Sequence, residues 1–171
     1  MSGSSAPSKT SIATGAARFS DDRKYRYLLT REFGGISTCL FLMLNPSIAD
    51  DVVDDPTIRR CIGFARREGF GRLEIVNLYG FMATEPSTLF AEQDPIGTEN
   101  DSAIEESLDR ANLVIAAWGN HGSHTPNRVE HVVGMIRNYG KRAVCFGLTK
   151  QIQPRHPLYL AANTALIEFP T

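Results

Sequence analysis

The chain has 171 residues, of which 42% are hydrophobic and 22% are charged, as in an ordinary soluble domain that is large enough for a full core. The net charge of -1 excludes a molecule-wide positive field for nucleic acid, so such binding would need a local patch. The three cysteines show neither a disulfide framework nor a metal-ligand spacing. Because the sequence also lacks a membrane-length apolar run and a basic-then-apolar leader, we expect a cytoplasmic protein without a membrane partner.

The N-terminal residues predict a tail followed by one domain. Residues 1–18 are rich in Ser, Ala, Thr and Gly without periodicity, so we expect a flexible tail there and a single α/β domain over residues 19–171. Residues 25–31 alternate apolar and polar side chains, and a second β-prone run at 36–44 follows a Gly-Gly pair at 34–35. Two such runs around two glycines predict an antiparallel hairpin at the start of the sheet.

An apolar run at residues 39–44 ends abruptly at Asn45-Pro46, and a loop rich in Asp and Ser follows it. A short continuous apolar run before a proline turn is typical of a buried central strand. The polar loop then lies at the C-terminal edge of the sheet, which is where open α/β folds bind their ligands.

The rest of the chain alternates predicted helices with predicted strands. Asp55 and Pro56 suit the N-cap and the first position of a helix that ends near Glu68. Further strands are predicted at 73–78, 113–118, 142–146 and 165–169, with helices near 86, 98–111 and 125–140. Because strands reached through helices run parallel, we expect a three-layer α/β/α fold with a mainly parallel central sheet.

Four arginines, Arg59, Arg60, Arg66 and Arg67, fall on the face of the first predicted helix opposite its apolar stripe. Such a cluster can grip the phosphates of a nucleic-acid backbone. A basic helix face that is simply exposed to solvent is the alternative interpretation.

Two asparagines follow neighbouring predicted strands at the same edge of the sheet, Asn45 after the first strand and Asn77 at the end of the second. A carboxamide presents a donor and an acceptor in one plane, which suits the edge of an amide-like ring such as a nucleobase. Either side chain could instead satisfy the backbone of its own loop. Pro46 and Ser47 directly follow Asn45 and are candidates for the same binding loop.

The loop of residues 119–124 joins a predicted strand to a helix and brings Gly119, Asn120 and His121 to this edge. Free backbone N–H groups at such a turn could bind an anion, although the lysine and the glycine spacing of a P-loop are missing. Tyr79 lies near the same edge and could stack on a flat ligand, or it could pack against the core.

Asp50 belongs to a group of four aspartates between residues 50 and 55. These carboxylates fit a solvated loop, a magnesium site, or the base that activates a water molecule. His156, in a later irregular loop, could donate a hydrogen bond to a developing oxyanion or move a proton near neutral pH. A histidine that is bonded to a nearby carbonyl is the structural alternative.

Five segments of the chain stand out as motifs: MLNPSIADDVVDDPTIRRC, VNLYGFMAT, IGTEND, AAWG and GLTKQIQPRHPLY. Together they resemble the domain of unknown function 1643 family of bacteria and phages. The likeness extends from about Phe19 to Phe169, which is nearly the whole predicted domain. It implies membership of this family and no particular activity.

The order of three motifs more distantly resembles the uracil-DNA glycosylase superfamily. These motifs are Asn45-Pro46 after a first strand, Asn77 at the end of a second strand, and a late His156-Pro157. The resemblance implies a uracil-DNA-glycosylase-like fold. It also implies that Asn45 orients a water molecule or the sugar, that Asn77 reads an imide edge, and that His156 stabilises the departing base.

The same resemblance assigns Leu158 to the space that a flipped base leaves in the stack. Three positions depart from the superfamily, because Met43 and Ser47 stand where glycine is usual and Leu158 stands where the late loop usually has serine. A side chain at either glycine position restricts the close approach of the backbone to a base or phosphate.

We therefore expect an enzyme that acts on a nucleobase, nucleoside or nucleic acid by hydrolysing an N-glycosidic bond, without a required cofactor. The expected catalytic residues are Asn45, His156 and Asp50, and the expected substrate-binding residues are Pro46, Ser47, Asn77, Tyr79, Gly119, Asn120, His121 and Leu158. A non-catalytic module that binds a nucleotide or modified base is one alternative. A magnesium-dependent, phosphate-handling enzyme that uses the loop of residues 50–55 is the other.

Overall fold

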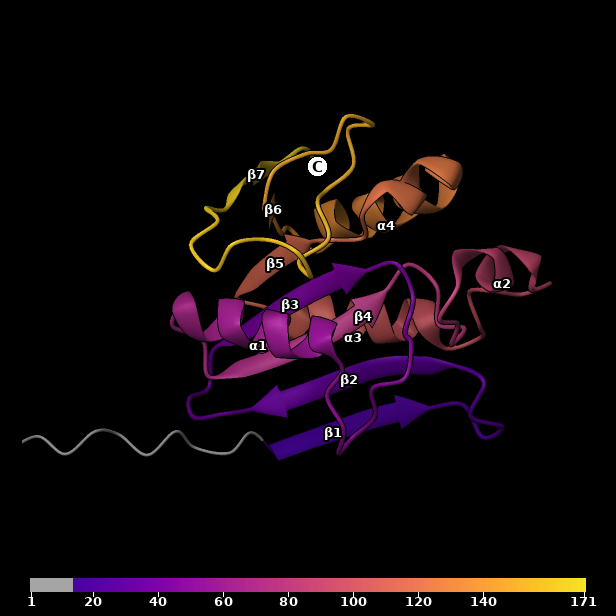
Figure 1. The fold of residues 1–171 in the computed structure, drawn as a ribbon, viewed down its shortest axis with the longest axis horizontal. Helices are drawn as coiled ribbons and strands as arrows, with labels where there is room; N and C mark the ends of the chain where they lie inside the picture. Colours follow the sequence, from indigo (N-terminus) through magenta and orange to yellow (C-terminus); the bar gives the residue numbers. More distant parts are fainter. Residues whose placement is uncertain (1–13) are drawn as a thin grey trace, which may run out of the picture.

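The computed structural model describes residues 14–171, which form a seven-stranded mixed sheet and four α-helices (Figure 1). The strands are β1 (Thr14–Phe19), β2 (Arg26–Glu32), β3 (Thr38–Met43), β4 (Arg72–Asn77), β5 (Leu113–Ala116), β6 (Ala143–Cys145) and β7 (Ile167–Phe169). The helices are α1 (Pro56–Arg67), α2 (Pro86–Ala91), α3 (Asn100–Arg110), α4 (Pro126–Asn138) and the short 3-10 helix η1 (Asn120–His124). Among these helices, none has both the length and the apolar character that a membrane span requires. The expected α/β class is confirmed.

The sheet has the strand order β1-β2-β4-β3-β5-β6-β7. Strands β4, β3, β5 and β6 form a parallel core, and each of the other three strands runs antiparallel to its neighbours. Three of the six strand pairings are therefore parallel, which corrects the expectation of a mainly parallel sheet. The additional antiparallel pairings come from β1 and β2 at one edge and from β7 at the other.

Strands β2 and β3 do not form the hairpin that the Gly-Gly pair predicts, because β4 lies between them in the sheet. Gly34 and Gly35 both have positive φ, and their backbone lies against Gly71 just before β4. A Cβ atom on Gly71 would collide with the Gly34 carbonyl oxygen. The glycines thus let the chain pass closely over the start of β4 instead of closing a two-residue turn. The hairpin at this edge is formed by β1 and β2.

Part of the predicted tail belongs to the sheet. Strand β1 pairs with β2 from Thr14 onward, which corrects the predicted boundary between residues 18 and 19. Its sequence, TGAARF, lacks the bulky alternating side chains that mark a strand, so pairing with β2 overrides a weak local preference. Residues 1–13 of the predicted tail lie outside the described residues.

Helix α1 begins as the sequence predicts. The Asp55 side chain accepts a hydrogen bond from the Ile58 backbone N–H at 2.8 Å, and Pro56 occupies the first turn. The apolar stripe of α1 is buried against the sheet through residues that include Ile58, Cys61 and Ala65. This packing holds the N-terminal end of α1 beside the edge where β3 and β4 end.

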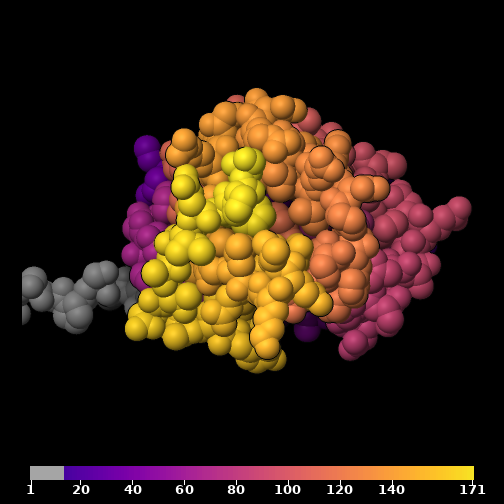
Figure 2. Space-filling model, turned by 90° about the horizontal axis from the view of Figure 1, so that it is seen from above, coloured from indigo at the N-terminus to yellow at the C-terminus, as the bar shows by residue number. Residues whose placement is uncertain are grey.

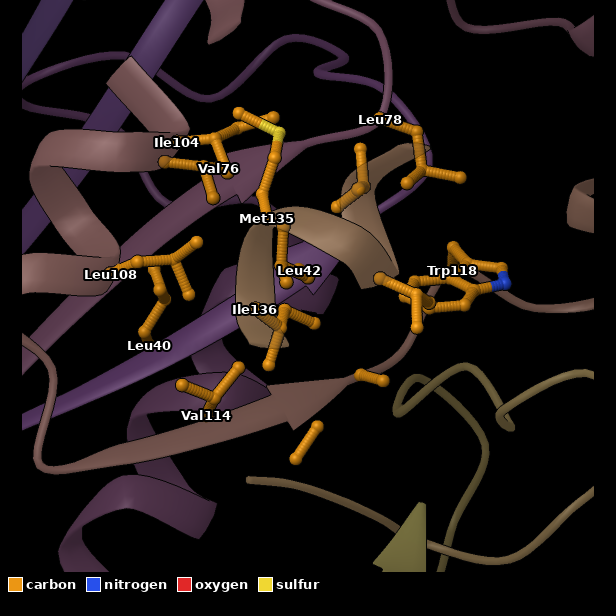
Figure 3. Close-up of a cluster of buried hydrophobic side chains, with 14 of the residues drawn as sticks. Leu40, Leu42, Val76, Leu78, Ile104, Leu108, Val114, Trp118, Met135 and Ile136 are labelled. Atoms are coloured by element: carbon orange, nitrogen blue, oxygen red, sulfur yellow. The ribbon is translucent and has the colours of Figure 1, made fainter. Parts of the chain in front are cut away.

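The core has two halves, one on each face of the sheet. Side chains alternate along β3, so Leu42 joins the half covered by α3 and α4, and Met43 joins the half covered by α1. Figure 3 shows the first half, where side chains from β3, β4, β5, α3 and α4 meet. Asn77 follows Ile75 by two positions in β4, so the same alternation directs Asn77 toward the α1 face.

The last third of the chain forms one side of the molecule. Seen from above, this surface consists largely of the orange α4 region and the yellow segment that leads to β7 (Figure 2). The long connection between β6 and β7 carries His156 and then runs past α1, where Arg60 donates a hydrogen bond to the Leu160 carbonyl oxygen. This connection closes one side of the edge at which the parallel strands end.

Candidate functional site

A cavity of about 480 Å³ opens where β3 and β4 end, on the face covered by α1. It is lined by residues of these two strands, the first turn of α1, and the loops after β5 and β6. Its volume is typical of pockets that hold small ligands. Eight residues that the sequence nominated line it: Asn45, Ser47, Asn77, Gly119, Asn120, His121, His156 and Leu158.

Two of the remaining nominated residues are buried outside this lining. The Pro46 carbonyl oxygen accepts a hydrogen bond from the Ala83 backbone N–H at 3.1 Å, which joins two loops. Tyr79 belongs to the core half with α3 and α4, and its ring meets the Phe90 ring edge-on with the centroids 6.1 Å apart. Tyr79 therefore packs within the protein instead of facing the cavity.

The Asp50 carboxylate is turned toward its own loop and also lies outside the cavity lining. Its Oδ1 accepts hydrogen bonds from the backbone N–H groups of Val53 at 2.7 Å and Val52 at 2.8 Å, which hold the pKa of Asp50 below its usual value. Asp54 forms an ion pair with Arg31 at 2.8 Å. Within the part of the chain that the structure describes, no three Asp, Glu, His or Cys side chains gather as metal ligands would.

Asn77 presents an unpaired carboxamide to the cavity. The residue is 2% exposed and lines the cavity, yet its side chain makes no hydrogen bond with any of residues 14–171. Its backbone carbonyl oxygen, by contrast, accepts a hydrogen bond from Nδ2 of Asn100 at 3.0 Å. A buried carboxamide without protein partners is unfavourable unless a ligand or water supplies them.

The Asn45 side chain is bonded at one end only. Its Nδ2 donates to the carbonyl oxygens of Ala83 at 2.7 Å and Pro46 at 3.0 Å. Because carbonyl oxygens accept, these two bonds fix which end of the amide is nitrogen. Among the described residues nothing donates to Oδ1, so this atom is the part of Asn45 that a ligand or water can use.

His156 lies at the exposed rim of the cavity, where surrounding protein atoms still displace part of its water. Burial lowers the pKa of His156, and the charge of Asp55 opposes this shift. The imidazole is therefore neutral at pH 7. Its Nδ1 accepts a hydrogen bond from the Leu158 backbone N–H at 3.2 Å, so the ring is not engaged by a carbonyl as the structural alternative supposed.

The loop after β5 needs glycine at its first position, because Gly119 has a φ of 75° and a ψ of -170°. The Gly119 N–H donates to the Pro154 carbonyl oxygen at 2.9 Å, and the Gly122 N–H donates to that of Gly119 at 3.2 Å. These two groups are thus used within the protein instead of being free for an anion. His121, from the same loop, lies near the ring of Phe90 with the centroids 6.5 Å apart.

The cavity also contains residues that the sequence did not bring to attention. Arg26 and Thr57 line it, as does Asp55, which the sequence assigned to the helix cap, and Trp118, an aromatic residue that the sequence places near this edge. Ser47 Oγ donates a hydrogen bond to Oδ2 of Asp55 at 2.8 Å. Arg26 stands in an alternating strand, where a charged residue is expected to face solvent, and yet it is 3% exposed.

The arginines of α1 lie away from this cavity. Arg59, Arg60 and Arg67 line a second cavity of about 210 Å³, whereas the Arg66 guanidinium lies over the Phe33 ring, 4.8 Å from its centroid. Two of them donate to backbone carbonyls of the segment that follows His156, which binds that segment to α1. Since carbonyls are neutral, these contacts leave the charge of Arg60 in place, whereas Arg67 is also paired with Glu68 at 2.6 Å.

The chain matches the family described as "Protein of unknown function (DUF1643)" over residues 26–158. Residues at both ends of this match, Arg26 and Leu158, line the cavity, so the matched segment includes the whole lining. No curated protein and no solved structure matches the chain. The chain belongs to the DUF1643 family of proteins of unknown function.

Proposed function

We propose that the cavity binds a nucleobase and that the chain hydrolyses the N-glycosidic bond that joins this base to its sugar. The observation that carries this function is the unpaired carboxamide of Asn77, which belongs to a nearly fully buried side chain in the cavity lining. A carboxamide offers one donor side and one acceptor in the same plane. This pattern complements the imide or amide edge of a base.

The rest of the lining suits a flat ring. Leu44, Ile58 and Trp118 contribute apolar surface around the polar groups. Small-molecule pockets typically combine mostly apolar walls with a few polar groups that fix the orientation of the ligand. A planar heterocycle with a polar edge matches this combination.

Two side chains of the cavity fit the chemistry of bond cleavage. When the C–N bond breaks, its electron pair goes to the base, and negative charge develops on a carbonyl oxygen of the base. The neutral ring of His156 donates a hydrogen bond from Nε2 to this oxygen. Oδ1 of Asn45 accepts a hydrogen bond from the water that attacks the sugar carbon, and the proton of this water passes to the departing base or to solvent.

The order of the residues along the chain supports the same function. Asn45, Asn77 and His156 follow one another as the corresponding groups do in the uracil-DNA glycosylase superfamily, which the motifs resemble. That three residues from distant segments line one cavity also favours a shared role.

A second candidate is a binding module without catalysis. The Asp50 carboxylate is bonded to its own loop, and the two oxygens of Asp55 accept from Ile58 and Ser47. Asp50 lies outside the cavity lining, and each Asp55 oxygen already accepts a hydrogen bond, so neither carboxylate is well placed to take a proton from water in the cavity. A site that reads a base but lacks a general base would bind it without turnover.

The test is a panel of DNA, RNA and nucleosides that contain uracil or modified bases, with released free base measured by chromatography. We expect release by the wild type and a loss of about a hundredfold in both Asn77→Ala and His156→Ala. Asn163→Ala is the matched control, because this asparagine is exposed and outside the cavity lining. Binding without release would favour the binding module, and the absence of both for every base would refute both functions.

A further inference from the structure

Arg26 is a buried cation in the cavity wall without an acidic partner. It is 3% exposed, it lines the cavity, and its Nη1 donates to the carbonyl oxygen of Ala49. Its Nε is sealed from solvent and unbonded, and no acceptor for Nη2 is found among residues 14–171. Over the same residues, no Asp or Glu lies within ion-pair distance of Arg26. One edge of the guanidinium is therefore left unpaired.

The charge of Arg26 is not removed by its surroundings. Burial lowers the pKa of Arg26 to about 10, with the charge of Asp55 opposing the shift, so the guanidinium stays protonated at neutral pH. Asp55 acts on Arg26 only through its charge, because among residues 14–171 no carboxylate oxygen lies within ion-pair distance of Arg26; the Asp55 oxygens accept hydrogen bonds from the Ile58 N–H and the Ser47 hydroxyl. A buried charge in this condition is unfavourable unless an anion compensates it.

We propose that Arg26 is a phosphate subsite of the cavity, so that the ligand is a nucleotide, either free or within a strand, and not a bare base. The nature of the base rests on the proposed function, whereas the anion subsite rests on Arg26 alone. Arginine binds phosphate oxygens through charge-assisted hydrogen bonds from its planar group. With Nη1 bonded to Ala49, the Nη2 side of the group remains for this contact.

A single ligand can reach both Arg26 and Asn77. Arg26 comes from β2 and Asn77 from β4, which are neighbouring strands of the sheet. Both side chains line the same cavity of about 480 Å³, within the range that accommodates ligands of nucleotide size. The sugar would then lie between the group that reads the base and the group that holds the phosphate.

The experiment measures the binding of four probes by calorimetry at constant ionic strength. The probes are inorganic phosphate, deoxyuridine, deoxyuridine 5′-monophosphate, and a short single strand that contains deoxyuridine. Wild type is compared with Arg26→Gln and with the matched control Arg142→Gln. The Arg142 side chain is 85% exposed and pairs with Glu168 at the surface.

We expect a phosphate-bearing probe to bind wild type and Arg142→Gln about tenfold to a hundredfold more tightly than deoxyuridine does. Arg26→Gln should lose this advantage and keep its affinity for deoxyuridine. Tighter binding of the monophosphate than of deoxyuridine identifies a free nucleotide as the ligand. If only the single strand binds more tightly than deoxyuridine, the ligand is a nucleotide within a polymer. Equal binding of nucleoside and phosphate-bearing probes by the wild type, or an advantage that survives in Arg26→Gln, would overturn the subsite.

The anion subsite and the proposed function fail in different ways. Phosphate binding that depends on Arg26, without binding of any nucleoside, would keep the subsite and refute the nucleobase function. Deoxyuridine binding that depends on Asn77, with no gain in affinity when the probe carries a phosphate, would keep the nucleobase function and refute the subsite. If Arg26→Gln does not fold, Arg26→Lys takes its place, because lysine keeps the charge but not the planar fork of donors. The affinities of the four probes for the wild type and for Arg26→Lys then decide between these outcomes.

Discussion

The backbone N–H of Leu158 donates a hydrogen bond to Nδ1 of His156 at 3.2 Å. A ring nitrogen that accepts a hydrogen bond cannot carry a proton, so the neutral imidazole holds its proton on Nε2. The loop after β6 therefore selects one tautomer before any ligand is bound. This tautomer is the one that can donate a hydrogen bond to a negatively charged oxygen.

Binding or release of a base should fall as the pH is lowered through the pKa of His156. Burial lowers this pKa below the usual value of 6.5, so the loss is expected on the acid side of that value. Protonation would put a proton on Nδ1 and break the hydrogen bond from Leu158. Folding stability should change in the same direction, because the unfolded chain takes up this proton more readily than the folded protein.

The measurement is the rate or affinity between about pH 5 and 8 for wild type and His156→Gln. The variant should have low activity that no longer falls as the pH is lowered. His131→Gln is the matched control, because His131 lies outside the cavity lining, 3.1 Å from Asp101. If the activity of His156→Gln still falls at low pH, the titration belongs to another group.

Glu74→Ala should destabilise the fold by about 3 kcal/mol, the low end of the range for breaking a buried ion pair. The Glu74 side chain is fully buried and accepts from Arg110 Nε at 3.0 Å and Arg72 Nη2 at 2.9 Å. The value lies at the low end because both arginines reach solvent once the carboxylate is gone. Urea unfolding measures the loss, and Glu168→Ala, at an exposed ion pair, should change stability by less than about 0.5 kcal/mol.

Gly119→Ala should destabilise the fold by about 1–3 kcal/mol, because the backbone of Gly119 has a conformation that is essentially restricted to glycine. The added methyl would lie 3.5 Å from His156 Cβ, an ordinary van der Waals contact, so the expected cost comes from the backbone and not from a collision. Gly63→Ala is the opposite case, since Gly63 lies within α1 with no atom within 4 Å of the added methyl. Thermal unfolding should show a gain of about 0.5–1 kcal/mol for Gly63→Ala, and equal effects of the two substitutions would refute the role of backbone strain.

DNA binding through α1 should be weak and steeply dependent on salt. Arg59, Arg60 and Arg67 surround a small cavity; the carbonyls that Arg59 and Arg60 contact do not neutralise them, whereas Arg67 is paired with Glu68 at 2.6 Å. Replacing Arg59 by Ala should weaken binding to every sequence alike and reduce the slope of log affinity against log salt by about 1. Fluorescence anisotropy at several salt concentrations measures this slope. Arg142→Ala should leave it unchanged, and affinity that is indifferent to salt would exclude a phosphate contact here.

The sequence predicted the elements that have strong local signals. The cap by Asp55 and the apolar stripe of α1 are both present, and the buried run before Asn45 is the central strand β3. Because parallel strands end at one edge, sequence reasoning could also anticipate that Asn45 and Asn77 lie in one region. Features that strand direction and helix caps determine were therefore predictable.

Features that depend on long-range packing could not be predicted. The passage of Gly34 over Gly71 replaced the expected hairpin, and nothing in the local sequence distinguishes the two outcomes. Arg26 is buried because the loop that contains Ala49 covers it, which no strand pattern indicates. The Asp50 carboxylate bonds to the backbone two and three residues later, and composition alone could not separate this turn from a metal ligand.

Arg60 of α1 contacts the carbonyl oxygen of Leu160 across 100 positions of the chain. On the ribosome, α1, β3 and β4 emerge long before the segment that carries His156. A nascent chain at that stage would hold Asn77 at an incomplete pocket that is open to water. A ligand that needs both walls of the cavity can therefore stabilise only the complete fold and cannot aid the folding of the earlier segments alone.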